Sequence, residues 1–554
     1  MTKLRVFLGT LVLLSFSTAG AQPPVIQFNL LYQRNGTAVD DYFGTSVAGG
    51  GDINNDGRTD FIVGAPQVAI FTEQAVGDGY VKVYSGINGA PLMSLQSPGV
   101  DPCPLCCVWF GWSVANAGNV DINAGADFIV GSPYWDNIDG RALVYRKKTG
   151  DSIIYDLQVQ DACETCTPQC RVLAAWSGWS VAGIGDVNAD GKADFIVGET
   201  HKTDLATAGS AKVFSGVDGS ILTTVNGTEP GAFFGSAVAG AGDIYGGGAL
   251  DFIVGDWGVD AGGTDRGKVY IYSGTSPYDT LFTRNGEQDG DRFGWSVASV
   301  GDVNGDRKDD ILVGAYRANP GGLNDAGKVY LYSGASGYPL IATLNGAAAA
   351  DSFGYSVAGL GDVDADEVPD FVVGAPGNQT GRGKIYIYSG YDRSLLGSKV
   401  GGAPGVGFGY SVAKGGDMTG DGLSEIIAGA PYATYNSNED AGSVYVYKPV
   451  LLAPPRIRAP LPTTFSLEQN YPNPFNANTN ISFSLDAGSR VELVVYNILG
   501  EKVRTLVSED RPAGTHQVAF DGRDAKGKTL SSGTYFYKLT AGDRVVTKQM
   551  VLVK

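Results

Sequence analysis

Histidine and basic residues are scarce in this sequence, and each shortage excludes a class of function. The 554 residues include two histidines, His201 and His516, and neither stands near a nucleophile in a catalytic motif. Ser-His-Asp or Cys-His catalysis requires a base beside the nucleophile, so this chemistry is not expected. The net charge of −18 argues against nucleic acid or an anionic membrane as a partner. Cations are the favoured small partners.

Long apolar runs are also missing, apart from one short run at residues 6–16. Lys3 and Arg5 precede this run, and small residues follow it before Gln22. The pattern predicts a signal peptide over residues 1–21 and an exported mature protein. A membrane anchor is the alternative, but about a dozen apolar residues are fewer than the roughly 20 that span a bilayer.

Methionine is rare, whereas glycine, tyrosine and phenylalanine are plentiful, which is typical of short strands joined by tight turns. The chain repeats itself seven times. Strings similar to FGTSVAGGGDINNDGRTDFIVGAP begin at Phe43, Phe110, Ser177, Phe234, Phe293, Phe353 and Phe408. Their second residues, about 55 to 67 positions apart, are Gly44, Gly111, Gly178, Gly235, Gly294, Gly354 and Gly409.

Each repeat contains four strand-like segments, which in the fifth repeat are WSVASV, DILVGAY, KVYLYSG and LIATLNG. Seven such units predict a closed seven-bladed β-propeller over residues 22–448, with an open solenoid as the alternative. The last repeat lacks a fourth strand after Tyr447, and residues 28–36 resemble that missing strand. We therefore expect the N-terminal strand to complete the last blade and to close the ring.

Most repeats also contain the pattern D-x-[ND]-x-D-x-x-x-D in a hairpin loop, here called loops 1 to 7 after their repeats. Side-chain oxygens at positions one, three, five and nine, with a backbone carbonyl at position seven, suit Ca²⁺, which takes six to eight oxygens. Five loops are predicted to bind calcium. Their ligands are Asp52, Asn54, Asp56 and Asp60; Asp186, Asn188, Asp190 and Asp194; Asp302, Asn304, Asp306 and Asp310; Asp362, Asp364, Asp366 and Asp370; and Asp417, Thr419, Asp421 and Glu425.

The two remaining loops depart from the pattern. Loop 2 offers Asn119, Asp121, Asn123 and Asp127, so its affinity should be lower; in loop 4, Tyr245 and Gly247 replace two ligands, and no ion is expected. The alternative for all the loops is simple turn chemistry, because Asp, Asn and Gly favour turns. We expect that a turn alone would not require Asp at position nine, which favours the metal.

The FG-x-S-V-A and D-F-I-V-G-A-P strings resemble the FG-GAP propeller of integrin α-subunits over residues 28–447. The resemblance implies calcium on hairpin loops of one face and a ligand-binding surface on the opposite face. Aromatic residues beside acids are the ligand candidates: Tyr134, Trp135 and Asp136, Asp256 and Trp257, and Tyr432 follow the V-G end of a strand and should cluster on one face. Packing between blades is the alternative.

The six cysteines form two clusters, Cys103, Cys106 and Cys107, and Cys163, Cys166 and Cys170. Export and an even count favour disulfides over a zinc site, although sequence cannot select the pairing.

A proline-rich linker is expected over residues 449–464, followed by a β-sandwich of about seven strands over residues 465–554. The strings YPNPFN, VYNILGEKVRTL and SSGTYFYKL resemble the type A sorting domain of the bacterial type IX secretion system, which is similar to the FlgD-type immunoglobulin-like domain. An ordinary adhesive immunoglobulin-like domain is the alternative. The resemblance implies export to the medium or the outer surface of a Gram-negative bacterium.

Together these features predict a calcium-binding module for adhesion or binding, with a protein or glycan ligand on the propeller. The alternative is an extracellular hydrolase or lyase with an acid-based site, because two carboxylates leave no linear signature.

Overall fold

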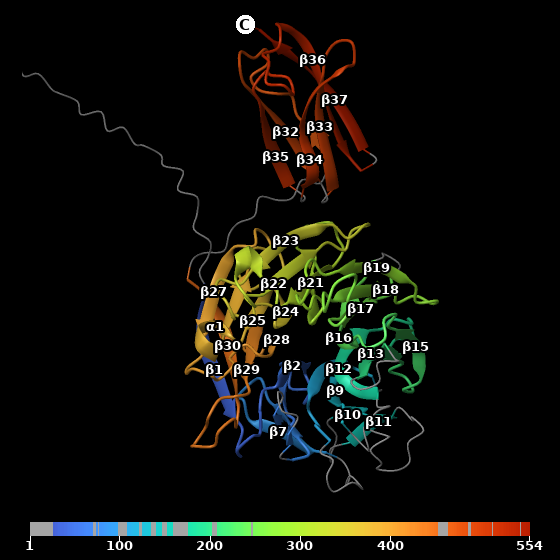
Figure 1. Cartoon of the computed structure of the whole chain (residues 1–554), viewed down its shortest axis with the longest axis vertical. Helices are drawn as coiled ribbons and strands as arrows, with labels where there is room; N and C mark the ends of the chain where they lie inside the picture. Colours follow the sequence, from blue (N-terminus) through green and yellow to red (C-terminus); the bar gives the residue numbers. More distant parts are fainter. Residues whose placement is uncertain are drawn as a thin grey trace, which may run out of the picture.

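The chain forms a ring of small β-sheets and a separate β-sandwich (Figure 1). The computed structural model describes residues 26–69, 74–75, 77–97, 108–120, 125–134, 140–146, 152–158, 175–201, 208–244, 248–452, 464–485, 489–511, 514–542 and 544–553. The predicted signal peptide and the six cysteines lie outside the described residues.

Seven antiparallel sheets of four strands each make the propeller, as the repeats predicted. From the first to the sixth repeat the strands are β2 (Ser46–Gly51), β3 (Asp60–Ala65), β6 (Tyr80–Tyr84) and β7 (Pro91–Gln96); β8 (Ser113–Gly118), β9 (Asp127–Ser132), β10 (Arg141–Arg146) and β11 (Ser152–Gln158); β12 (Ala175–Gly185), β13 (Asp194–His201), β14 (Ser210–Phe214) and β15 (Ile221–Asn226); β16 (Phe234–Gly242), β17 (Asp251–Asp256), β18 (Lys268–Tyr272) and β19 (Thr280–Asn285); β20 (Ser296–Gly301), β21 (Asp310–Ala315), β22 (Lys328–Tyr332) and β23 (Leu340–Asn345); and β24 (Ser356–Gly361), β25 (Asp370–Ala375), β26 (Lys384–Tyr388) and β27 (Leu395–Val400).

The N-terminal strand closes the ring, which confirms the prediction from the missing fourth strand. The seventh blade consists of β28 (Val412–Gly416), β29 (Glu425–Ala430), β30 (Ser443–Leu451) and β1 (Ile26–Asn35). β1 pairs antiparallel with β30, from Ile26 opposite Leu451 to Asn35 opposite Ser443. β30 continues through Pro449, within the stretch predicted as a linker. Closure therefore gives the last blade its fourth strand and covers the outer edge of β30.

The second strand of each blade is apolar on both faces because it lies between neighbouring blades. Every residue of β21 and β25 is buried, and Ile311, Leu312 and Val313 are at most 1% exposed. Buried residues from adjacent blades form shared clusters, so each blade depends on its neighbours for a core.

The repeated FG and VG pairs join one blade to the next. The Phe or Ser of each FG-like pair bridges to a glycine that precedes the third strand of the previous blade, and the last bridge joins Phe43 to Gly442. A Cβ at Gly64 would lie 2.0 Å from the carbonyl oxygen of Gly111, so only glycine permits this approach. Ser46 Oγ donates a hydrogen bond to that same carbonyl at 2.8 Å. The motif is therefore the joint between blades.

The C-terminal part is a sandwich of seven strands, as the alternation predicted. One sheet has the order β31-β32-β35 and the other β34-β33-β36-β37. Apolar residues from both sheets, including Phe483, Val495 and Tyr537, form its core. The strands are β31 (Ser466–Leu467), β32 (Thr479–Leu485), β33 (Ser489–Tyr496), β34 (Lys502–Arg511), β35 (Gly514–Phe520), β36 (Gly533–Ala541) and β37 (Arg544–Leu552).

Small elements complete the fold. A two-residue hairpin pairs β4 (Val68–Ala69) with β5 (Gln74–Ala75), and one helical turn each lies at η3 (Pro320–Gly322) and α1 (Asn378–Gly381). Within the described residues, no helix has the length and apolarity needed to cross a membrane.

Candidate functional site

Each predicted calcium loop joins the first and second strands of its blade. A glycine in the left-handed region ends the first strand and turns the chain into the loop, as at Gly301 with φ 83° and Gly361 with φ 78°. Position one follows this glycine, and position nine begins the second strand. The same frame recurs in loops 1, 3, 5, 6 and 7.

Position one holds the turn of the loop. The two carboxylate oxygens of Asp52 accept hydrogen bonds from the backbone N–H groups of Asp56 and Gly57 at 2.9 and 2.7 Å. Asp362 makes the same bonds to Asp366 and Glu367 at 3.1 and 2.8 Å. Turn chemistry therefore accounts for this acid, even without a metal.

Position nine also has a structural role, and the expectation that a turn alone would not require this acid is wrong. Asp370 accepts one bond from Val363 N at 2.8 Å and another from Gly390 N, beyond the third strand, at 2.9 Å. In loop 4, where no ion is expected, Asp251 makes the same two bonds to Ile244 N and Gly274 N, each at 2.9 Å. Buried N–H groups require a partner, and the acid at position nine makes both kinds of bond in loops 1, 3, 4, 5 and 6, so it holds these loops to their blades.

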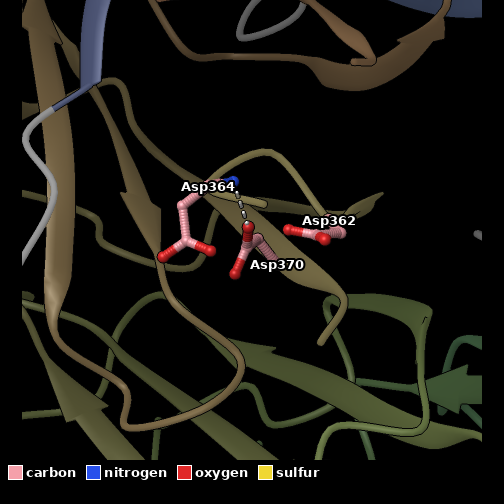
Figure 2. Close-up of side chains that lie close together, drawn as sticks. All are labelled: Asp362, Asp364 and Asp370. Atoms are coloured by element: carbon pink, nitrogen blue, oxygen red, sulfur yellow. Dashed lines mark hydrogen bonds between the residues drawn. The ribbon is translucent and has the colours of Figure 1, made fainter. Parts of the chain in front are cut away.

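Loop 6 is where the structure brings three acids together (Figure 2). Among the described residues, Asp362, Asp364 and Asp370 are the one group of three acidic side chains whose ligand oxygens lie within 4.8 Å of one another. Asp364 and Asp370 are fully buried. Burial, and then the charge of Asp364, raise the pKa of Asp370 to about 8. A divalent cation among these oxygens would offset both effects.

Loops 1, 3 and 5 have asparagine at position three and do not bring three acids as close. Burial raises the pKa of their position-nine acids, to about 6 for Asp60 and Asp194 and to about 8 for Asp310. In loop 5 the amide of Asn304 donates to Asp310 at 3.3 Å and to Ser333 Oγ at 2.9 Å. The side-chain amide at position three carries no charge, so repulsion between carboxylates is weaker in these loops than in loop 6.

Loop 7 has a lysine among its predicted ligands. Lys448 Nζ lies 2.8 Å from Asp421 Oδ2 and donates to Thr419 Oγ1 at 3.1 Å. Its hydrogen bond to Asp421 raises the pKa of Lys448. Burial raises the pKa of Glu425, which accepts from Thr419 Oγ1 at 3.0 Å. Positions three and five of loops 2 and 4 lie outside the described residues; they are Asp121, Asn123, Tyr245 and Gly247.

A cavity of about 940 Å³ lies at the other end of the inner strands, where the FG motifs are. The residue after the FG-like pair lines it in all seven repeats: Thr45, Trp112, Trp179, Ser236, Trp295, Tyr355 and Tyr410. Trp257 and Tyr432 also line the cavity, in agreement with the prediction that they lie on one face. Trp135 lies outside the described residues. The sequence did not lead to a functional prediction for the residue after the FG-like pair, although aligning the repeats shows an aromatic residue there in most copies.

The aromatic side chains form two arcs around this cavity. The ring centres of Trp112 and Trp179 lie 4.8 Å apart. The ring centre of Tyr355 lies 5.3 Å from that of Trp295 and 4.7 Å from that of Tyr410. Thr45 and Ser236 interrupt the arcs in the first and fourth blades. Flat, partly exposed rings and a concave shape are typical of ligand sites.

An arginine already occupies part of the aromatic surface. The guanidinium of Arg292 lies 4.4 Å from the ring centre of Trp257, and its Nη1 donates to Tyr316 Oη at 2.8 Å. Asp325 is the only carboxylate among the described residues that line the cavity.

Comparisons with known proteins agree with this fold. The FG-GAP repeat profile matches residues 43–84, 293–332, 353–388 and 408–447, and the FlgD Ig-like domain profile matches residues 471–544. Integrin alpha-5 of Xenopus laevis is 31% identical over 306 residues, which cover 51% of this chain and 27% of that protein. Integrin alpha-V of Gallus gallus is 35% identical over 213 residues, covering 36% of this chain and 20% of the relative. The propeller is integrin α-like.

This integrin α-like propeller corresponds to only part of its relatives, since the chain spans about a fifth to a quarter of their length. Solved structures match weakly. PorZ, a surface component of the type IX secretion system of Porphyromonas gingivalis, gives a TM-score of 0.39 at 14% identity, covering 89% of this chain and 58% of PorZ. Sqt1 of Chaetomium thermophilum gives 0.43 at 13% identity, covering 76% of this chain and all of Sqt1. Scores this low support no conclusion.

Proposed function

We propose that the chain is an exported, calcium-binding propeller that acts as a binding or adhesion module. The aromatic cavity, to which every repeat contributes the residue after its FG-like pair, is the observation that carries this proposal. A protein or a glycan is the ligand class that such a surface suits. Integrin α relatives support binding over catalysis.

Calcium has a supporting role in this proposal. The loops lie at the opposite end of the inner strands from the cavity, so bound ions would stabilise the blades without touching the ligand. Loop 6 has the strongest case, because its acids are buried and close together.

Export is the remaining part of the proposal. A signal peptide over residues 1–21 and a sorting role for the sandwich would deliver the propeller to the medium or the outer surface of a Gram-negative bacterium. The match of residues 471–544 to an FlgD Ig-like domain supports the fold of that tail. Deleting residues 465–554 from the native gene should retain the protein inside the cell envelope.

The ligand site is tested by a glycan and protein screen on the full chain, followed by the W179A/W295A double variant. Both rings are partly exposed and line the cavity. The double variant should weaken binding of the best screen hit by at least about tenfold, since buried aromatic anchors dominate interfaces. Y391A is the control, because Tyr391 is 45% exposed and does not line the cavity. Unchanged binding in the double variant would place the ligand elsewhere.

A further inference from the structure

In each blade, strand pairing places one residue, at or just beyond the end of the regular third-strand pairing, beside position nine of the loop. In the fifth blade Ile311 pairs with Tyr332, which places the next residue, Ser333, beside position nine. Ser333 Oγ donates to the position-five carboxylate of Asp306 at 2.7 Å. Five repeats have serine at this position and the other two have a basic residue; the seven residues are Ser85, Arg146, Ser215, Ser273, Ser333, Ser389 and Lys448.

In the seventh blade, Lys448 brings a positive charge to the place where five of the other six blades have a serine hydroxyl. Ile426 pairs with Tyr447, so Lys448 stands beside Glu425 at position nine. Its ammonium contacts Asp421 at 2.8 Å and Thr419 at 3.1 Å, the residues at positions five and three. These are the side chains that would have to coordinate an ion.

The turn at position one of loop 7 is folded in the same way as in a loop with a full set of ligands. Asp417 accepts bonds from the N–H groups of Gly420, Asp421 and Gly422, and Asp302 of loop 5 accepts the three corresponding bonds. The frame is therefore kept, while position three has become a threonine that donates its proton to Glu425. A hydroxyl that donates to its neighbour and accepts from an ammonium suits an internal cation better than Ca²⁺.

We propose that Lys448 is the resident cation of loop 7: its ammonium takes the place of Ca²⁺, and this loop keeps its fold without metal. The inference is an alternative to the expectation that Asp417, Thr419, Asp421 and Glu425 bind calcium. It rests on the proposed calcium binding only in its comparison with the other loops.

A matched pair of variants tests the inference by counting bound calcium in the full chain with native mass spectrometry. D302N and D417N each remove the position-one carboxylate, from loop 5 and loop 7 respectively. In the wild type these two carboxylates accept corresponding backbone hydrogen bonds. We expect D302N to bind one ion fewer than the wild type and D417N to bind the same number as the wild type. Loss of one ion in D417N would overturn the inference.

Thermal melting in chelator separates this inference from the calcium proposal, because it requires no bound ion. K448M leaves Asp421 without its ammonium partner, so it should melt about 2 °C or more below the wild type, while K448R keeps the charge and should melt within about 1 °C of it. Added calcium should restore K448M but should not raise K448R above the wild type in calcium. K448M that melts with the wild type in chelator would overturn the inference, whether or not the other loops bind calcium.

Discussion

Loops 4 and 6 have the same frame and differ in what fills it. In both, the acid at position nine accepts one bond from position two and one from the glycine beyond the third strand. Loop 6 adds buried acids at positions three and five, whereas the sequence of loop 4 has Tyr245 and Gly247 there.

The comparison separates architecture from metal binding within a single motif. Position nine is retained where no ion is expected, so its presence says that a blade is folded and not that calcium is bound. Positions three and five differ between the two loops, and these positions decide how many carboxylates lie close together. An acid at position nine therefore does not by itself identify a metal site.

The largest effect should come from removing position nine from either loop. D251A leaves two buried N–H groups without an acceptor and D370A leaves the corresponding two and that of Asp364, at a cost of about 1–3 kcal/mol for each fully buried group. In chelator, both variants should lose a similar free energy of unfolding, on the order of 3 kcal/mol, as measured by denaturant titration. A loss confined to D370A would show that the two loops do not share a frame.

A smaller effect should follow from D364N, which removes a charge from the crowded acids of loop 6. The stabilisation by calcium should fall by about 2.7 kcal/mol when calcium is a hundredfold above its dissociation constant, which is the contribution of one site. In chelator the variant should be at least as stable as the wild type, because like charges are fewer. E367Q is the control, since Glu367 lies in the same loop but is exposed. Equal calcium stabilisation in D364N and E367Q would remove loop 6 from the calcium sites.

A still smaller effect concerns pH in the fourth blade, where no calcium is expected. Burial raises the pKa of Asp256 to about 8, and its Oδ2 is buried with no hydrogen-bond partner among the described residues. Because the pKa is higher in the folded state than in the unfolded state, stability should fall as pH rises from about 4 to about 8. D256N should flatten this fall by about 1–2 kcal/mol, with or without calcium. Parallel melting-temperature profiles of D256N and the wild type would refute the assignment to Asp256.

The sequence predicted the ring, its closure by residues 28–36 and the sandwich, because repeats and alternation report local strand structure directly. Loop chemistry was harder to predict. Asp251 and Asp370 look alike in sequence, and only their bonds to Gly274 and Gly390 show that position nine is structural. Lys448 is far from Thr419 and Asp421 in sequence, and strand pairing brings it to them, so a linear motif omits it. The cavity depends on ring closure in the same way.

The central claim is that calcium stabilises this propeller through loops such as loop 6. The most direct measurement is the melting temperature of the full chain in millimolar calcium and in excess chelator at constant ionic strength. Extracellular sites bind with dissociation constants of about 10⁻⁴ to 10⁻³ M, so we predict a clear rise that saturates in that range of calcium and that D364N reduces. A melting temperature that is the same in calcium and in chelator would contradict the claim.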